Sequence, residues 1–239
     1  MSLLSLYMLA AFAGACVQVG TGIGYSIIVA PMLVWTMGAK TSVPLLLALN
    51  LIVSLVALLG LERNDLVRSL LMSLAGTLVG IGLGSLVVRS LPEPVVIASM
   101  AVLLIGGAAV ASVPARQAGT VVQSAIGLLA GLATVATATP GPVMALGLIL
   151  SGAEGPAVRR RVQPIAAVAY AAALASLGPE AWHEVIANSA LSPLLLATGL
   201  GSVAGLVIGP KLPSAVILAV IRIISAGAGV ALLARLAQG

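Results

Sequence analysis

Apolar residues run along this chain in long stretches separated by a few polar residues, and these stretches predict helices that span a membrane. About 20 apolar residues cross the hydrocarbon core of a bilayer. On that length, proline, glycine and polar residues divide the chain into eight predicted spans. They lie near residues 3–37, 41–61, 66–89, 93–112, 119–151, 161–179, 190–209 and 213–236. The pattern leaves no stretch for a soluble domain and predicts an all-α polytopic membrane protein.

Two of the predicted spans are long and interrupted at their centres. Residues 14–31 read GACVQVGTGIGYSIIVAP and residues 131–148 read GLATVATATPGPVMALGL. An offset of 117 pairs Gly14 with Gly131 and Gly24 with Gly141. Backbone that leaves the helix at membrane depth lines a cavity or is buried in protein, and in transporters paired interruptions mark the substrate site. The two segments are therefore predicted to be two copies of one broken helix, in an internal repeat.

The similarity between the two parts of the chain extends beyond the broken helices. A second set of matches has an offset of 121 and pairs Gly80, Gly84, Leu91, Pro92 and Gly106 with Gly201, Gly205, Leu212, Pro213 and Gly227. We predict two four-helix repeats, residues 1–115 and 116–239, with the first helix of each repeat broken. Two halves with an even number of crossings run parallel. In the alternative arrangement each broken segment folds back as a re-entrant hairpin, which leaves three full crossings per half and inverted repeats.

Glycines recur at every fourth position in two of the predicted spans, at Gly76, Gly80 and Gly84 and again at Gly201, Gly205 and Gly209. Residues at this spacing lie along one side of a helix, where a missing side chain lets another helix approach closely. We expect tight helix packing along these rows. The alternative is a smooth face along which the broken helices slide during transport.

Composition and charge agree with a membrane protein and add its orientation. Hydrophobic residues make up 61% of the chain, charged residues make up 7%, and the mean hydropathy is +1.23, which excludes a soluble domain. The net charge of +5 is spread over short loops, so it indicates topology rather than nucleic-acid binding. With both termini outside, the predicted inside loops hold Lys40, Arg89, Arg159, Arg160, Arg161 and Lys211, and the outside loops hold Arg63, Arg68 and Arg116. The positive-inside rule then places both termini outside a bacterial-type cytoplasmic (inner) membrane.

The sequence lacks the residues that an enzyme or a metal site of this size would need. It contains one cysteine and one histidine, so no cluster of His, Asp or Cys is available for catalysis or metal binding. No GxxxxGK[ST] motif for a nucleotide occurs either. We expect no catalytic residues, no metal and no cofactor.

The first break offers backbone donors to a negatively charged ligand. A helix that restarts near Tyr25 points its positive dipole end at the break, and such an end binds anions. The predicted substrate-binding residues here are Gln18, Gly20, Thr21, Gly22 and Gly24. Gln18 directly precedes the GTGIG run.

The second break offers hydroxyl groups and two prolines. Thr134, Thr137 and Thr139 carry hydroxyls that can donate to a sulfonate or carboxylate oxygen, and proline removes a backbone donor and kinks the helix. Predicted substrate-binding residues here are Thr137, Thr139, Pro140 and Gly141. The alternative is that the threonines bond to carbonyls of their own helix and the prolines only bend it.

Arg222 is the last predicted substrate-binding residue. It stands nine positions after Pro213, about 14 Å along a helix, and thus inside the bilayer. Charged side chains at that depth face a cavity or a partner, and an incoming anion fits that role. The alternative is that Arg222 extends to the inner interface. Asn50, which is also predicted in mid-helix, could hydrogen-bond the substrate or join neighbouring helices by hydrogen bonds, and we expect the second.

The residues around the first break resemble a known family. The run GACVQVGTGIG at residues 14–24, followed by VAPML at residues 29–33, is similar to the opening signature of the TauE/SafE sulfite-exporter-like family of membrane permeases. The glycine and Leu-Pro elements ending at Pro92 and Pro213 also resemble that family's pattern. The resemblance implies a transporter of small anions such as sulfite, organosulfonates or simple carboxylates. The second break, TATPGP, has prolines where the family tends to have glycines, so the substrate preference does not follow from the resemblance.

Taken together, the sequence predicts a secondary transporter that moves small anions across the cytoplasmic membrane by alternating access. Its expected partners are the anionic substrate and the lipid bilayer, with a coupling ion and a homodimer left open and no nucleic acid. An anion-selective channel would use the same breaks. A membrane assembly protein without transport activity is the third alternative.

Overall fold

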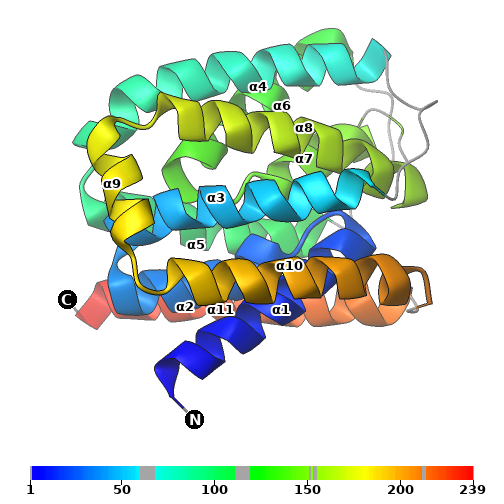
Figure 1. Ribbon diagram of the computed structural model, residues 1–239. Helices are drawn as coiled ribbons and strands as arrows, with labels where there is room; N and C mark the ends of the chain where they lie inside the picture. The colour runs from blue at the N-terminus through cyan, green and yellow to red at the C-terminus, as the bar shows by residue number, and fades with distance from the viewer. Residues whose placement is uncertain are drawn as a thin grey trace.

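The computed structural model describes residues 2–59, 68–110, 119–150, 152, 155–211 and 214–238, and within them the chain is all-helical (Figure 1). The predicted α-class is thus confirmed. The helices are α1 (Leu3–Thr21), α2 (Tyr25–Met37), α3 (Ala39–Leu58), α4 (Arg68–Val87), α5 (Glu93–Val110), α6 (Thr120–Thr137), α7 (Gly141–Leu150), α8 (Gly155–Ser176), α9 (Pro179–Ala187), α10 (Leu191–Ile208) and α11 (Ser214–Gln238), with short 3-10 turns η2 (Val88–Ser90) and η3 (Gly209–Lys211).

Several of these helices are suited to crossing a membrane. In the described part of the chain, α1, α3 and α10 are each long and apolar enough to span a bilayer. The number rises to four if α8 and α9, which meet at an angle of 109°, form one bent span. The protein is therefore a multi-pass membrane protein, and the predicted count of eight crossings depends on the paths of the two broken segments. Helix α9 was not predicted, because nearly all of its residues fall between the predicted spans 161–179 and 190–209.

The first broken segment folds back on itself. The Tyr7 hydroxyl on α1 donates to the Thr36 hydroxyl at the far end of α2 over 2.5 Å. A Cβ atom on Gly14 would lie 3.1 Å from Val29 Cγ2. In one continuous helix these last two residues would be about 22 Å apart at 1.5 Å per residue. Helices α1 and α2 thus form an antiparallel pair, the first hairpin (residues 3–37), whose tip is residues 22–24.

The second broken segment folds back in the same way. A Cβ atom on Gly147 of α7 would lie 2.9 Å from Ile126 Cγ2 on α6, although the two residues are 21 positions apart. This pair is the second hairpin (residues 120–150), and its tip is residues 138–140. A broken helix that continues straight across the membrane is therefore wrong for both segments. The hairpin alternative is what the structure has, because the residues at each tip reverse the chain instead of only bending it.

Glycine rows pack two pairs of helices closely together, as predicted. A Cβ atom on Gly201 of α10 would lie 2.8 Å from Phe12 Cα on α1, and one on Gly205 would lie 2.9 Å from Val19 Cβ. The same relation joins α4 with α6, where a Cβ atom on Gly76 would lie 3.1 Å from Leu128 N. Residue numbers rise together along both pairs, so each pair is parallel. A larger side chain at these glycines would force the helices apart.

Helices α5 and α11 end the two predicted halves, and they pack antiparallel. A Cβ atom on Gly229 of α11 would lie 2.9 Å from Ala101 O on α5, and the Ser225 hydroxyl donates to Leu104 O over 2.5 Å. The predicted parallel relation of the halves is therefore wrong, since each hairpin reverses the chain once more than a straight broken helix does. The division at residues 115 and 116 stays a prediction.

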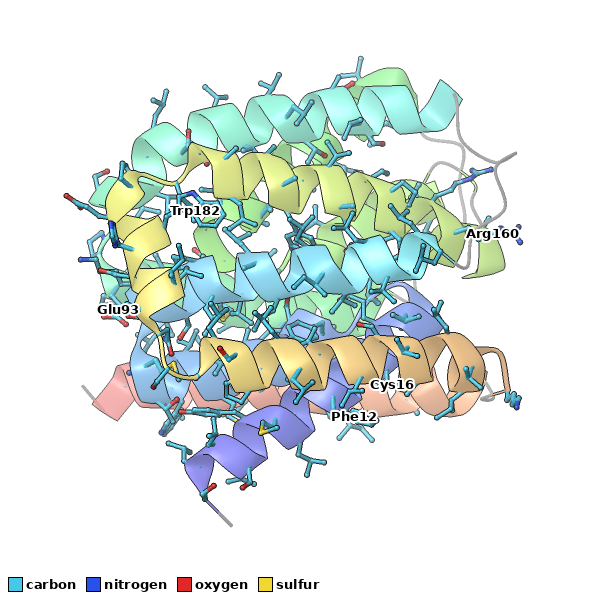
Figure 2. All side chains as sticks on the ribbon, viewed as in Figure 1. Phe12, Cys16, Glu93, Arg160 and Trp182 are labelled. Atoms are coloured by element: carbon cyan, nitrogen blue, oxygen red, sulfur yellow. The ribbon has the colours of Figure 1, made fainter. Side chains whose placement is uncertain are left out.

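The two ends of the molecule carry different charges. Both chain termini lie at one end (Figure 1), where Glu93 and Trp182 also lie, and Arg160 lies at the opposite end (Figure 2). Glu93 Oε1 accepts a hydrogen bond from Ala39 N over 2.7 Å, so Lys40 belongs to the Glu93 end. The predictions that Lys40 and Arg89 share a side with Arg160 are wrong, because the first hairpin returns the chain to the end from which it started. Arg89 lies in η2, just before Glu93, and so belongs to the Glu93 end as well.

Candidate functional site

The tips of the two hairpins touch inside the molecule. The Ser26 hydroxyl, at the start of α2, donates to Ala138 O at the second tip over 2.6 Å. A Cβ atom on Gly141 would lie 3.2 Å from Ile23 Cγ2 at the first tip. The two breaks, 117 residues apart in the sequence, therefore form one site between them.

Two glycines create the first tip. Gly22 ends α1 with φ 93°, and its amide donates to Gln18 O over 2.7 Å. Gly24 has φ 143°, and a Cβ atom there would lie 2.7 Å from Val17 Cγ1. Backbone with positive φ is strained for residues other than glycine. The predicted break at these glycines is thus confirmed, and it is where the chain changes direction.

The other predicted residues of the first break hold the tip together. Gln18 is buried, and its Oε1 accepts a hydrogen bond from the backbone amide of Tyr25 over 3.0 Å, which caps the N-terminus of α2. The Thr21 hydroxyl lies 2.9 Å from Val17 O and 2.6 Å from Ile23 O. Gly20 lies against η3, since its Cβ atom would be 3.2 Å from Gly209 Cα.

The second tip is built from threonines, an alanine and two prolines. Ala138 ends α6 in the left-handed region with φ 53°, and its amide donates to Thr134 O over 2.9 Å. The Thr137 hydroxyl donates to Ala133 O over 2.8 Å and also contacts the Thr139 hydroxyl. Pro140 O accepts the Met144 amide over 2.9 Å, which starts α7.

The threonine hydroxyls of the second tip are engaged within the protein in this conformation. Thr134 donates to Ala130 O over 2.7 Å, as Thr137 does to Ala133 O, so both bond to carbonyls of their own helix. This is the alternative that the sequence left open. Thr139 is 1% exposed, and its hydroxyl reaches Thr137. An anion at this tip would have to displace that contact.

Gln163 on α8 is a residue of the site that the sequence analysis missed. It is 2% exposed, and its Nε2 donates to Gly22 O over 2.8 Å and lies 3.4 Å from Gln18 O. The signal was a single amide side chain next to Pro164 inside a predicted span. It was hidden by the three arginines just before it, which resemble the end of a loop.

Asn50 joins α3 to the first tip, as its predicted helix-joining role requires. Its Nδ2 donates to Ser26 Oγ over 2.9 Å and to Leu46 O over 2.8 Å. The Tyr170 side chain on α8 also hydrogen-bonds with Ser26. Ser26 is therefore the centre of a buried network that reaches α3, α8 and the second tip.

Arg222 lies on α11 and is partly buried. One turn further along that helix is Ser225, which sits 3.7 Å from where a Cβ atom on Gly107 would be. The same Cβ atom would lie 2.8 Å from Pro142 Cγ in the first turn of α7. Helix α11 thus runs close to the second tip, and contact of Arg222 with a substrate stays a prediction.

The positive ends of two helix dipoles converge on the tips. Helix α2 starts at Tyr25 and α7 starts at Gly141, directly after the first and the second tip. The first amides of a helix have no carbonyl partner in that helix, so these ends attract anions. Within the described residues, no group of three or more His, Cys, Asp or Glu side chains is placed to hold a metal ion.

The site is closed in this structure. Gly22, Gly24, Ala138, Thr139 and Pro140 are all buried. A cavity beside the second hairpin, lined in part by Thr77, Met144 and Ile165, has a volume of about 10 Å³. That volume holds about one water molecule, which is too small for an oxyanion such as sulfite. A substrate would reach the tips only after they separate.

The comparisons with known proteins support a transport role for this fold. The sequence matches the family described as Sulfite exporter TauE/SafE over residues 7–236, which is nearly the whole chain. No curated protein and no solved structure matched. The apolar helices and the family agree that this is a membrane protein with a permease-like architecture. The chain therefore belongs to the TauE/SafE sulfite exporter family of membrane transporters.

Proposed function

We propose that the protein is a secondary transporter that binds a small anion between the two hairpin tips and moves it across the cytoplasmic membrane by alternating access. Sulfite, organosulfonates and related carboxylates are the proposed substrates. The observation that carries the proposal is the contact between the tips, in which Ser26 donates to Ala138 O and Ile23 packs against Gly141.

The chemistry of the tips favours an anion over a cation or a neutral solute. Two helix N-termini meet there, and each supplies a partial positive charge and amide donors. The Thr139 hydroxyl adds a donor once it leaves Thr137. Arg222 on the neighbouring α11 supplies a full positive charge that offsets the cost of bringing an anion into the membrane.

The arrangement of the hairpins suggests how access alternates. The first hairpin starts and ends at the end of the molecule that holds the chain termini, and the second starts and ends at the opposite end (Figure 1). The tips are thus approached from opposite sides. If one hairpin moves away from the other, the site opens to one side while packing on the other side stays closed. The contact between the tips represents the closed state between these movements.

The distribution of charge supports an orientation with both termini outside. Arg160 marks one end of the molecule (Figure 2), and Arg161 and Lys211 lie at that end. The opposite end holds three acidic residues, Glu93, Glu180 and Glu184, and three basic ones, Lys40, Arg89 and Arg235, which balance one another. Basic residues favour the cytoplasmic side. We therefore assign the Arg160 end to the cytoplasm.

Counterflow in proteoliposomes tests the proposal. Vesicles loaded with unlabelled sulfite should accumulate labelled sulfite transiently, because a carrier exchanges substrate across the membrane faster than it transports substrate in one net direction. The matched variants are Thr139→Val at the tip and Thr77→Val, which removes an equally buried threonine hydroxyl that bonds only to Ser73 O. We expect Thr139→Val alone to lower exchange. Sulfite current without counterflow would establish a channel instead, and no movement of sulfite, sulfonates or carboxylates would refute the proposal.

A further inference from the structure

Three buried side-chain oxygens next to the first hairpin have no hydrogen-bond partner among the described residues. They are Asn50 Oδ1 and Ser54 Oγ on α3 and Gln163 Oε1 on α8. The three side chains are 0%, 0% and 2% exposed. A buried acceptor that lacks a donor costs about 1–3 kcal/mol, so native proteins keep few of them without a reason.

The orientation of the two amides is fixed by their neighbours. Asn50 Nδ2 donates to Leu46 O, and Gln163 Nε2 donates to Gly22 O, both over 2.8 Å. A carbonyl oxygen can only accept, so rotating either amide by 180° would place two acceptors against each other. The unpartnered atoms are therefore carbonyl oxygens and not amide nitrogens.

Both amides contact the same short piece of chain. Asn50 bonds to Ser26, and Gln163 bonds to Gly22, only four positions earlier at the first tip. Helices α3 and α8 pack against each other beside this tip. Ser54 stands one turn after Asn50 on α3 and shares its face of the helix. Asn50 and Gln163 thus contact the first tip from two neighbouring helices, and Ser54 lies one turn from Asn50 on one of them.

Carbonyl and hydroxyl oxygens with no donor are ligands for a hard cation. An anion cannot satisfy the carbonyl oxygens of Asn50 and Gln163, because it brings only further acceptors, and the Ser54 hydroxyl can turn a lone pair to the same cation. Ca²⁺ and Mg²⁺ are generally bound with carboxylates, and no Asp or Glu lies in the described parts of α3 or α8. Unwound backbone carbonyls near a break in a membrane helix are known ligands of Na⁺ in transporters. The oxygens of Asn50, Ser54 and Gln163 carry no net charge, which suits a monovalent cation such as Na⁺ rather than a divalent one.

We propose that Asn50, Ser54 and Gln163 form a site for Na⁺ beside the first hairpin tip, with Na⁺ as the coupling ion of transport. The coupling part of this inference rests on the proposed anion site between the tips. A bound Na⁺ there would offset the charge of the anion, so that the pair enters the membrane interior at a lower cost than either ion alone. Binding of each ion then strengthens binding of the other by the same factor.

Two serine variants on one helix test the cation site. Ser54→Ala removes a proposed ligand oxygen, and because Ser54 Oγ bonds to no described group, it removes no protein hydrogen bond. Ser42→Ala is the matched control, since Ser42 is equally buried on α3, also has an unpartnered hydroxyl, and lies about 18 Å away along the helix. The Tm of the purified full chain in lipid nanodiscs is measured in NaCl, KCl and choline chloride at constant ionic strength, with no substrate anion present.

The expected result is a saturable rise of Tm with Na⁺ that choline does not give. Ser54→Ala should raise the half-saturating Na⁺ concentration about tenfold or more, and Ser42→Ala should leave it unchanged. Equal curves in NaCl and choline chloride for the unaltered protein would overturn the site and assign the oxygens to bridging waters. A wild-type Na⁺ response in Ser54→Ala would also overturn it.

A transport measurement separates the cation site from the anion site. Sulfite counterflow is repeated with choline in place of Na⁺. Loss of counterflow in choline supports coupling. Full counterflow in choline overturns the coupling role and leaves the anion transporter intact. A normal Na⁺ response of Tm without any anion transport would instead refute the proposed function and retain the cation site.

Discussion

Ser26→Ala should loosen the contact between the hairpin tips. The Ser26 hydroxyl is the described hydrogen-bond donor that crosses from the first hairpin to Ala138 O. The substitution removes that donor. It also removes one partner of Asn50 Nδ2, which keeps Leu46 O, and the Ser26 partner of the Tyr170 side chain, and these two losses are the same whether the tips are closed or open. Ala138 O then lacks its donor from Ser26 while the tips are closed, but it gains access to water or substrate when they separate.

The size of the effect follows from the burial of this hydrogen bond. Ser26 is 5% exposed, so the lost bond and the carbonyl left behind together cost about 1–3 kcal/mol in the closed state. The open state has no hydrogen bond between Ser26 and Ala138 O to lose, so this cost is absent there. The ratio of open to closed molecules should therefore rise roughly 5- to 150-fold, since 1.4 kcal/mol is a factor of ten.

Hydrogen–deuterium exchange of the protein in nanodiscs measures this ratio. Amides that exchange only after local opening do so at a rate proportional to the open population. Peptides that cover residues 22–26 and 138–141 should exchange at least fivefold faster in Ser26→Ala, while α3 should not change. Ser99→Ala is the control, because the Ser99 hydroxyl bonds only to Val95 O on its own helix. If exchange at both tips equals that of the control, the tip contact does not hold the site closed.

Three further predictions test the tip, the charge and the orientation. Gly24→Ala should lower the free energy of unfolding by about 2–5 kcal/mol, since it combines a positive φ with a Cβ atom 2.7 Å from a neighbouring side chain. Gly106→Ala is the control in the same thermal-unfolding experiment. It should be neutral or slightly stabilising, because a Cβ atom there has open space around it. Arg222→Ala should abolish anion uptake without lowering expression or Tm, and unchanged uptake would remove Arg222 from the site. A cysteine at Arg160 should react with a membrane-impermeant maleimide only from the cytoplasmic side and one at Lys40 only from outside, and the reverse pattern would invert the assigned orientation.

The positions of the breaks could be predicted from the sequence, but the direction of the chain after them could not. The backbone has a positive φ at Gly22 and Gly24, a conformation that favours glycine, and the glycines that mark it can be recognised in the sequence alone. Whether the second half-helix continues or returns depends on which helix it packs against. Length was the available clue, because residues 3–37 as one helix would be about 52 Å long, well beyond a bilayer core of about 30 Å.

Roles of single polar residues were predictable only in part. Asn50 was expected to join helices and does so. Thr137 was a predicted substrate-binding residue, and Thr134 carried a hydroxyl that could donate to a ligand, with bonding to their own helix as the alternative. A threonine in a helix has a carbonyl four positions earlier within reach, and both use it. Gln163 gave only a weak local signal, an amide beside a proline, since its contact with Gly22 spans 141 positions and depends on how α8 packs against the first hairpin.

The parallel glycine pairs decide which parts of the molecule can move as units. Helix α10 is locked onto α1 and α4 onto α6, by backbones too close to slide past each other without collision. Each hairpin is therefore fastened to a helix from the other half of the chain. A movement that separates the tips must carry α10 with the first hairpin and α4 with the second. The boundary between the moving bodies thus does not follow the midpoint of the sequence, because each body combines helices from both halves of the chain.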